Sequence, residues 1–161
     1  MGGFVWYGGA IVGGIVSMLF VRFKKWPLGP WLDLFAPIIA LGYAIGRFAC
    51  FLTGCCYGAV CVLADGTGFR HPTQLYATAW EAVALAILLW LEKQKLRNWP
   101  SGRIFSTWLI MHSIGRIVME SFRDDPRGPT PLGLSLATWI SLGLITATLA
   151  LTWRKAWRKA L

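Results

Sequence analysis

The chain has 161 residues, of which 56% are hydrophobic and only 14% are charged, and its mean hydropathy is positive. A soluble globular domain is about half apolar and about one quarter charged, so this composition excludes that class and indicates a membrane protein. The net charge of +9 would favour nucleic-acid binding in a soluble protein, but the position of the basic residues along this chain favours a membrane.

Five apolar segments are long enough to cross a bilayer. Because backbone polar groups find no water in lipid, such segments must be helices of about 20 residues. The predicted fold is therefore an all-α, polytopic membrane helix bundle that forms a single domain over residues 1–161. Its helices are predicted at about residues 4–21, 31–52, 73–91, 104–121 and 134–153.

The basic residues lie mainly on one side of this predicted bundle. Eleven of them lie after the first predicted helix, between the third and the fourth, or after the fifth. The connections on the other side of the bundle contain only Arg70, Arg123 and Arg127. By the positive-inside rule, the eleven face the cytoplasm. The amino terminus is therefore predicted outside, and the lipid bilayer rather than nucleic acid is the expected partner. The first helix begins after three residues with no basic segment before it, so an amino-terminal part is expected to be missing.

Four ionisable residues fall inside predicted membrane helices, namely Arg47, Glu81, Arg116 and Glu120. Such a group costs about 2.5 to 3.5 kcal/mol near the bilayer centre, so each is a candidate functional residue. A rise of about 1.5 Å per residue across a core of about 30 Å places all four toward its outer half. The sequence therefore predicts a polar centre in the outer leaflet.

Structural and functional explanations compete for these charges. Arg116 and Glu120 are four residues apart on one helix face, which predicts an internal ion pair. Arg47 would have to pair with Glu81 or Glu120, and either pairing would bring helices together around a buried polar centre. Two arginines at this depth also suit a phosphate, because the guanidinium fork binds its oxygens bidentately and stays charged. A phospholipid head group is the expected ligand.

The four cysteines offer a different class of function. Cys50, Cys55, Cys56 and Cys61 lie near the predicted outer face, where disulfides persist, so a membrane thiol–disulfide redox protein is the alternative. The chain has no C-x-x-C pair, which weakens that alternative. The cysteine spacing also lacks the usual zinc pattern, so a structural disulfide or inert thiols are expected and no metal site is predicted.

Three segments in a fixed order carry a family resemblance. They are "GRFACFLTGCCYG" from Gly46, "RHPTQLY" from Arg70 and "GRIVMESF" from Gly115. Together they resemble the signature segments of bacterial prolipoprotein diacylglyceryl transferases. The resemblance implies a multi-pass inner-membrane enzyme without a cofactor. It would move the diacylglyceryl group of phosphatidylglycerol to the lipobox cysteine of a prolipoprotein signal peptide, forming a thioether and releasing glycerol phosphate.

The resemblance also assigns roles to residues. The implied catalytic residues are Arg47, Arg116, Glu120 and Tyr7, and the implied substrate-binding residues are Arg47, Arg116, Gly54, Gly58, His71, Gln74 and Tyr76. Glu81 is added to the substrate-binding candidates because it falls in the predicted polar centre. Tyr7 stands where many members have a histidine that is a proposed base, and Cys50, Thr53, Cys55 and Ala77 also depart from the usual residues. A truncated, noncatalytic family member is therefore a further alternative.

The two histidines also have structural explanations. His71 precedes a proline at the start of a predicted helix, which suits a cap at the outer edge. His112 lies between apolar residues of the fourth predicted helix, so a packed or hydrogen-bonded histidine is expected there.

Overall fold

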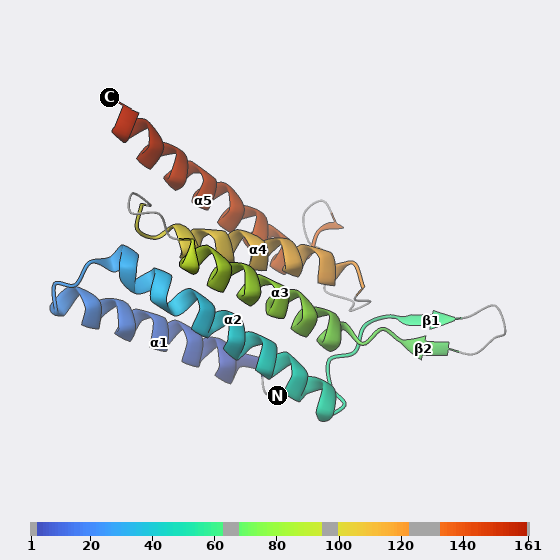
Figure 1. Ribbon diagram of the computed structural model, residues 1–161. Helices are drawn as coiled ribbons and strands as arrows, with labels where there is room; N and C mark the ends of the chain where they lie inside the picture. Colours follow the sequence, from blue (N-terminus) through green and yellow to red (C-terminus); the bar gives the residue numbers. More distant parts are fainter. Residues whose placement is uncertain (1–2, 63–67, 95–99, 123–132, 161) are drawn as a thin grey trace.

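Five helices and one short hairpin make up the described part of the computed structural model (Figure 1). The structure describes residues 3–62, 68–94, 100–122 and 133–160, with side chains described for 12–62, 68–94, 100–122 and 133–153. The helices are α1 (Gly3–Phe23), α2 (Leu28–Leu52), α3 (Thr73–Lys93), α4 (Arg103–Glu120) and α5 (Leu136–Ala160). The hairpin strands β1 (Val60–Val62) and β2 (Gly68–Arg70) lie between α2 and α3.

The helical fold predicted from the sequence is confirmed, with differences at the ends and in one connection. α2 begins at Leu28 rather than residue 31, and α5 continues to Ala160 rather than ending at 153. The segment before α3, which was expected to be a loop, contains the antiparallel hairpin, with Cys61 opposite Phe69. Its strands are only three residues long, too short to give a clear alternating pattern in the sequence.

Several helices are apolar enough to cross a membrane. α2, α3 and residues Leu136–Trp153 of α5 satisfy both length and hydropathy, and the described side chains of α1 form a shorter apolar stretch, Val12–Phe23. α4 does not qualify, since basic, acidic and histidine side chains interrupt its apolar sequence. The protein is therefore a helical membrane protein, whereas five complete spans remain a prediction.

The core lies where α2, α3 and α4 pack together (Figure 1). On α2 the residues Ala36, Ala40 and Ala44 are all buried, and their spacing of four places them on one face. Such small side chains let neighbouring helices approach closely. Leu88 of α3 and Trp108 of α4 fill the space against this alanine face, so the three helices are fixed close to one another.

Asp33 joins the start of α2 to the start of α4. Its side chain is only 5% exposed, and its carboxylate oxygens accept hydrogen bonds from the backbone N–H groups of Gly102 at 2.7 Å and Phe105 at 3.0 Å. The first N–H groups of a helix have no partner within the helix, and they carry partial positive charge. Asp33 therefore caps α4 from a different helix.

Replacing Asp33 with alanine is expected to lower the free energy of unfolding by about 2 kcal/mol, because two partly buried backbone N–H groups lose their acceptor. Thermal unfolding in detergent micelles would measure the loss. Asp33→Asn provides the control, since its amide oxygen can still accept a hydrogen bond and should restore part of the stability. Equal stability of Asp33→Ala and the unchanged chain would contradict this capping role.

Candidate functional site

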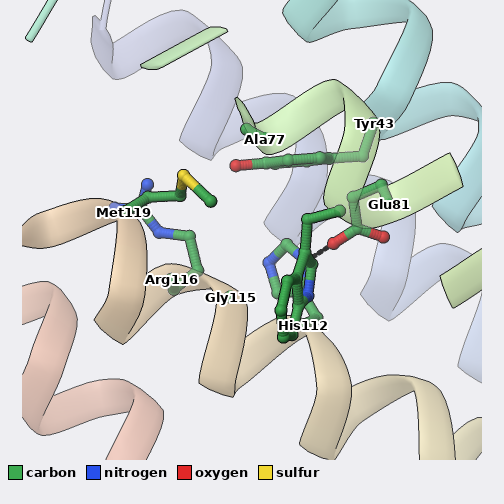
Figure 2. A pocket seen from close by; sticks show the side chains of 8 residues that line it. Tyr43, Ala77, Glu81, His112, Gly115, Arg116 and Met119 are labelled. Atoms are coloured by element: carbon green, nitrogen blue, oxygen red, sulfur yellow. Dashed lines mark hydrogen bonds and ion pairs between the residues drawn. The ribbon is translucent and has the colours of Figure 1, made fainter. Parts of the chain in front are cut away.

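A small pocket opens between α2, α3 and α4 (Figure 2). Its empty volume of about 190 Å³ includes space that is open to solvent, so the site is a shallow hollow between the helices rather than an enclosed cavity. The lining residues are Tyr43, Ala77, Trp80, Glu81, His112, Gly115, Arg116 and Met119.

Glu81 is the buried acceptor at one side of this pocket. Its side chain is 2% exposed, and one carboxylate oxygen lies 2.5 Å from His112 Nδ1. The other oxygen accepts a hydrogen bond from Trp108 Nε1 at 3.3 Å. A hydrogen bond from Nδ1–H to a carboxylate fixes the imidazole tautomer and leaves Nε2 as the acceptor. The expected hydrogen-bonded role of His112 is thus confirmed.

The Arg47 side chain bonds Tyr43 rather than Glu81. Its Nε donates a hydrogen bond to the Tyr43 hydroxyl at 3.0 Å, and its guanidinium lies 5.2 Å from the centre of the same ring. Glu81 bonds His112 instead. The sequence offered Glu81 or Glu120 as the partner of Arg47. Glu81 is not that partner, and Tyr43, one helical turn before Arg47 on α2, is within reach of Arg47 instead.

Tyr43 connects Arg47 with the pocket. Its ring packs edge-on against the His112 ring, with 4.8 Å between the ring centres. Figure 2 shows its hydroxyl directed toward the side of the pocket lined by Met119 and Arg116. The hydroxyl that accepts from Arg47 thus belongs to a wall of the same pocket that Arg116 lines.

Arg116 lines the pocket directly, whereas Arg47 reaches it only through Tyr43. Arg116 Nη2 lies 3.7 Å from the Glu120 carboxylate one turn later on α4, which confirms the predicted internal ion pair. The Arg116 side chain is 21% exposed and that of Glu120 is 14% exposed. Arg116 is therefore oriented by a neighbour yet still reaches the pocket.

Gly115 makes room for the Trp80 ring. A Cβ at position 115 would lie 2.5 Å from Trp80 Cδ1, closer than real Cβ atoms approach. Trp80 Nε1 donates to the Met111 carbonyl at 2.9 Å, which holds the indole against α4. The glycine next to Arg116 thus permits the close packing of α3 on α4.

Replacing Gly115 with alanine is expected to lower the free energy of unfolding by about 1 to 3 kcal/mol, because the indole must move and its hydrogen bond is strained. Thermal unfolding together with tryptophan fluorescence would measure both changes. Gly143→Ala on α5 is the control, since nothing lies within 4 Å of a Cβ there. A Gly115→Ala chain as stable as the control would show that the indole can shift without cost.

A second group of predicted site residues lies at the base of the hairpin. The His71 ring lies near the rings of Tyr76 and Phe122, and His71 Nδ1 is 3.4 Å from the Tyr76 hydroxyl. Gly58 donates its N–H to the His71 carbonyl at 2.8 Å, and a Cβ on Gly58 would lie 2.7 Å from Thr73 Cγ2. These residues join the hairpin to the adjoining ends of α3 and α4.

The sequence predicts that His71 caps the start of α3, but its side chain does not do so. Pro72 occupies the cap position, and no side-chain hydrogen bond is made there. Instead, the rings of His71 and Tyr76 pack across the helix start, the arrangement of a hydrophobic staple.

The remaining predicted residues lie at the end of α2. Gly54 has φ +70° and ends the helix, and the Cys55 thiol accepts a hydrogen bond from the Thr53 hydroxyl at 3.4 Å. This bond lowers the pKa of Cys55, whereas burial raises the pKa of Cys56. Gln74 of α3 is fully buried, and its side-chain N–H donates to the Cys55 carbonyl. Tyr7 lies in α1, and its side chain is outside the described residues.

Sequence reasoning missed Tyr43, Trp80 and the place of His112 in the pocket. A signal was present for two of them, because Tyr43 precedes Arg47 by four residues and His112 precedes Arg116 by four. Residues at this spacing share a helix face. Trp80 had no such signal, since its position depends on the absence of a side chain at Gly115.

The fold and the pocket define a helical membrane protein with basic side chains at a polar site between its helices. The family model for prolipoprotein diacylglyceryl transferase matches residues 1–154. The chain belongs to the prolipoprotein diacylglyceryl transferase family.

The chain resembles curated members of this family from several bacteria. It is 39% identical over 152 residues to the phosphatidylglycerol–prolipoprotein diacylglyceryl transferase of Clostridium tetani, covering 87% of this chain and 59% of that protein. It is 35% identical to phosphatidylglycerol–prolipoprotein diacylglyceryl transferase 2 of Clostridium perfringens, with 89% of this chain and 59% of that protein covered. It is 32% identical to the Prochlorococcus marinus transferase, with 95% of this chain and 58% of that protein covered. The chain thus spans less than two thirds of the length of these relatives.

Proposed function

We propose that this chain transfers the diacylglyceryl group of phosphatidylglycerol to the lipobox cysteine thiol of a prolipoprotein signal peptide. The observation that carries the proposal is the pocket between α2, α3 and α4, because Arg116 and the Arg47-bound Tyr43 line the same hollow. The family's relatives are named for the same substrates. Arginine suits this position, because it remains charged in apolar surroundings and binds phosphate oxygens as a fork.

The proposed reaction forms a carbon–sulfur bond and breaks a carbon–oxygen bond. The thiolate attacks the glycerol carbon that bears the phosphate, and glycerol phosphate leaves with the bonding electrons. Arg47 and Arg116 stabilise the negative charge that grows on the leaving phosphate, an effect that is strong where water is scarce. Glu120 orients Arg116 through their ion pair.

His112 is the proposed acceptor of the thiol proton. A free thiol has a pKa near about 8.5 and is mostly protonated at neutral pH, so the attack needs a base. The side chain of His112 is 20% exposed and lines the pocket, with Nδ1 bonded to Glu81. Nε2 is then available for the proton. Tyr7 is a further proposed site residue, which the family resemblance suggests as a hydrogen-bond partner of the substrate.

The test is transfer by the purified chain in vesicles of phosphatidylglycerol. With label in the glycerol that bears the acyl chains, a lipobox peptide should gain label and the mass of a diacylglyceryl group. A Cys-to-Ser lipobox peptide is the control and should gain neither. If the folded chain transfers nothing, while a relative of full length does so under the same conditions, the noncatalytic alternative is correct.

The proposed location is the bacterial inner membrane, with the hairpin outside and the α3–α4 connection in the cytoplasm. In a chain whose four cysteines are serine, a membrane-impermeant maleimide added to intact spheroplasts should label Val62→Cys in β1. It should label Lys93→Cys at the end of α3 only after the membrane is opened, since the basic connections face the cytoplasm. If the maleimide labelled position 93 but not position 62 in intact spheroplasts, the proposed topology would be contradicted and the opposite orientation would be correct.

A further inference from the structure

Three thiols that are not part of the pocket converge where α2 ends. The Sγ atoms of Cys50, Cys55 and Cys56 all lie within 4.8 Å of one another, and none of the three forms a disulfide. Cys50 is half-buried, whereas Cys55 and Cys56 are exposed. Cys61, in β1, does not belong to this three-cysteine cluster.

The backbone brings these thiols together through the way in which α2 ends. Gly54, with φ +70°, donates its N–H to the Phe51 carbonyl at 3.1 Å, and Cys55 donates to the Cys50 carbonyl at 3.1 Å. This pair of hydrogen bonds is a Schellman motif, which turns the chain back over the last helical turn. Cys55 is therefore returned toward Cys50.

Cys56 has an unusual backbone conformation. Its φ is +63°, a region that costs about 1 kcal/mol or more for a residue other than glycine. Such conformations persist only where the surroundings hold them, and they concentrate at functional sites. Here the conformation keeps the Cys56 thiol beside the other two.

Two buried side chains of α3 hold this turn from the other side. Thr73 Oγ1 donates to the Cys56 carbonyl at 3.0 Å, and the side-chain N–H of Gln74 donates to the Cys55 carbonyl. Thr73 is 5% exposed and Gln74 is fully buried. A rigid backbone under ligating side chains is what a metal site requires, because it limits the entropy lost on binding.

The distances suit a thiophilic ion after small side-chain rotations. Zinc–sulfur bonds are about 2.3 Å long, so three sulfurs around one tetrahedral ion lie about 3.8 Å apart. Three thiolates and one Zn²⁺ carry a net charge of −1. Arg47, one turn before Cys50 on α2, is close enough to influence Cys50 and Cys56 electrostatically. The positive charge of Arg47 would offset the negative charge of the site with zinc bound.

We propose that Cys50, Cys55 and Cys56 form a three-thiolate site for one zinc ion, with a fourth coordination position open to solvent. The three thiols lose their protons to the buffer on binding, and no redox step is involved. The cysteine spacing shows no C-x₂₋₄-C pattern and therefore did not indicate zinc. The three thiols meet instead because one lies at the end of α2 and two lie in the turn that reverses the chain. The site does not depend on transfer activity.

The experiment is a titration of the reduced, chelator-treated chain in detergent micelles under anaerobic conditions. Zn²⁺ binding is measured by competition with a chromophoric chelator, and Cd²⁺ binding by thiolate-to-metal absorption in the ultraviolet. One ion per chain is expected. Each of Cys50→Ser, Cys55→Ser and Cys56→Ser should weaken binding by at least about tenfold, because even outer-shell partners of a metal are worth ten- to hundredfold.

Cys61→Ser is the matched control, since Cys61 is half-buried in the hairpin and should bind metal as the unchanged chain does. Circular dichroism of each variant shows whether the helices persist, so that lost binding in a folded variant supports the site. Zinc affinity that is unchanged when all three cysteines are serine would overturn the proposal. So would a Cys50–Cys55 or Cys55–Cys56 disulfide found by mass spectrometry in chain alkylated directly in cells.

Discussion

Arg47→Lys and Arg116→Lys are each expected to fold and insert normally yet to lose about 99% of transfer activity. Arg47 uses Nε for the Tyr43 hydroxyl, which leaves its terminal N–H groups for a phosphate. A lysine ammonium is a point charge without a planar fork, so it cannot bond the Tyr43 hydroxyl and also bind a phosphate bidentately in the same geometry. One missing charge-assisted contact in a site with little water costs about 3 kcal/mol, or on the order of a hundredfold in rate.

Transfer of labelled diacylglyceryl to a lipobox peptide measures this loss, and thermal unfolding confirms that each variant is folded. Arg103→Lys, at the start of α4, is the matched control and should retain full activity because Arg103 does not line the pocket. If either lysine variant transferred at a near-normal rate, the arginine at that position would have no role in binding phosphate. Its role would then be structural, through Tyr43 for Arg47 or through Glu120 for Arg116.

Replacing His112 with glutamine is expected to reduce transfer by about a hundredfold or more, the usual contribution of a general base. The glutamine amide can still donate a hydrogen bond to Glu81, so the fold should persist. The variant keeps a donor for the buried carboxylate but has no group that accepts a proton near neutral pH. The rate of transfer at saturating peptide is the quantity to measure.

Two further measurements separate a base from a structural residue. Imidazole in the buffer should restore part of the activity of His112→Gln but not that of Arg116→Lys. Ser113→Ala, next to His112 on α4, is the control, because Ser113 is buried but does not line the pocket. Full transfer by a folded His112→Gln chain would exclude His112 as the base and favour Glu120 or Tyr7.

The sequence was a good guide to the helices because each is a long apolar segment, and lipid allows such a segment few other structures. It also predicted the ion pair of Arg116 with Glu120, since that contact depends only on spacing within one helix. The partner of Glu81 could not be predicted in this way. Whether Arg47 or His112 reaches Glu81 depends on how α2 and α4 are rotated against α3, and that rotation is set by packing.

The same limit explains the other misses. No local pattern singles out Asp33, because its partners are backbone N–H groups that follow it by about seventy residues. The three-cysteine cluster depends on the reversal of the chain at Gly54 and on Thr73 and Gln74 from another helix. Features made by a single segment could be read from the sequence, and features made between segments required the structure.

The Asp33 cap has a geometric consequence for the two arginines. Arg47 follows Asp33 by fourteen residues, and Arg116 follows Gly102, the residue that Asp33 binds, by the same fourteen. At about 1.5 Å per residue, both guanidinium-bearing residues are carried about 21 Å from this shared anchor. The Asp33 carboxylate thus fixes the start of α4 relative to α2, and both arginines lie at a similar distance along the bundle from that one contact.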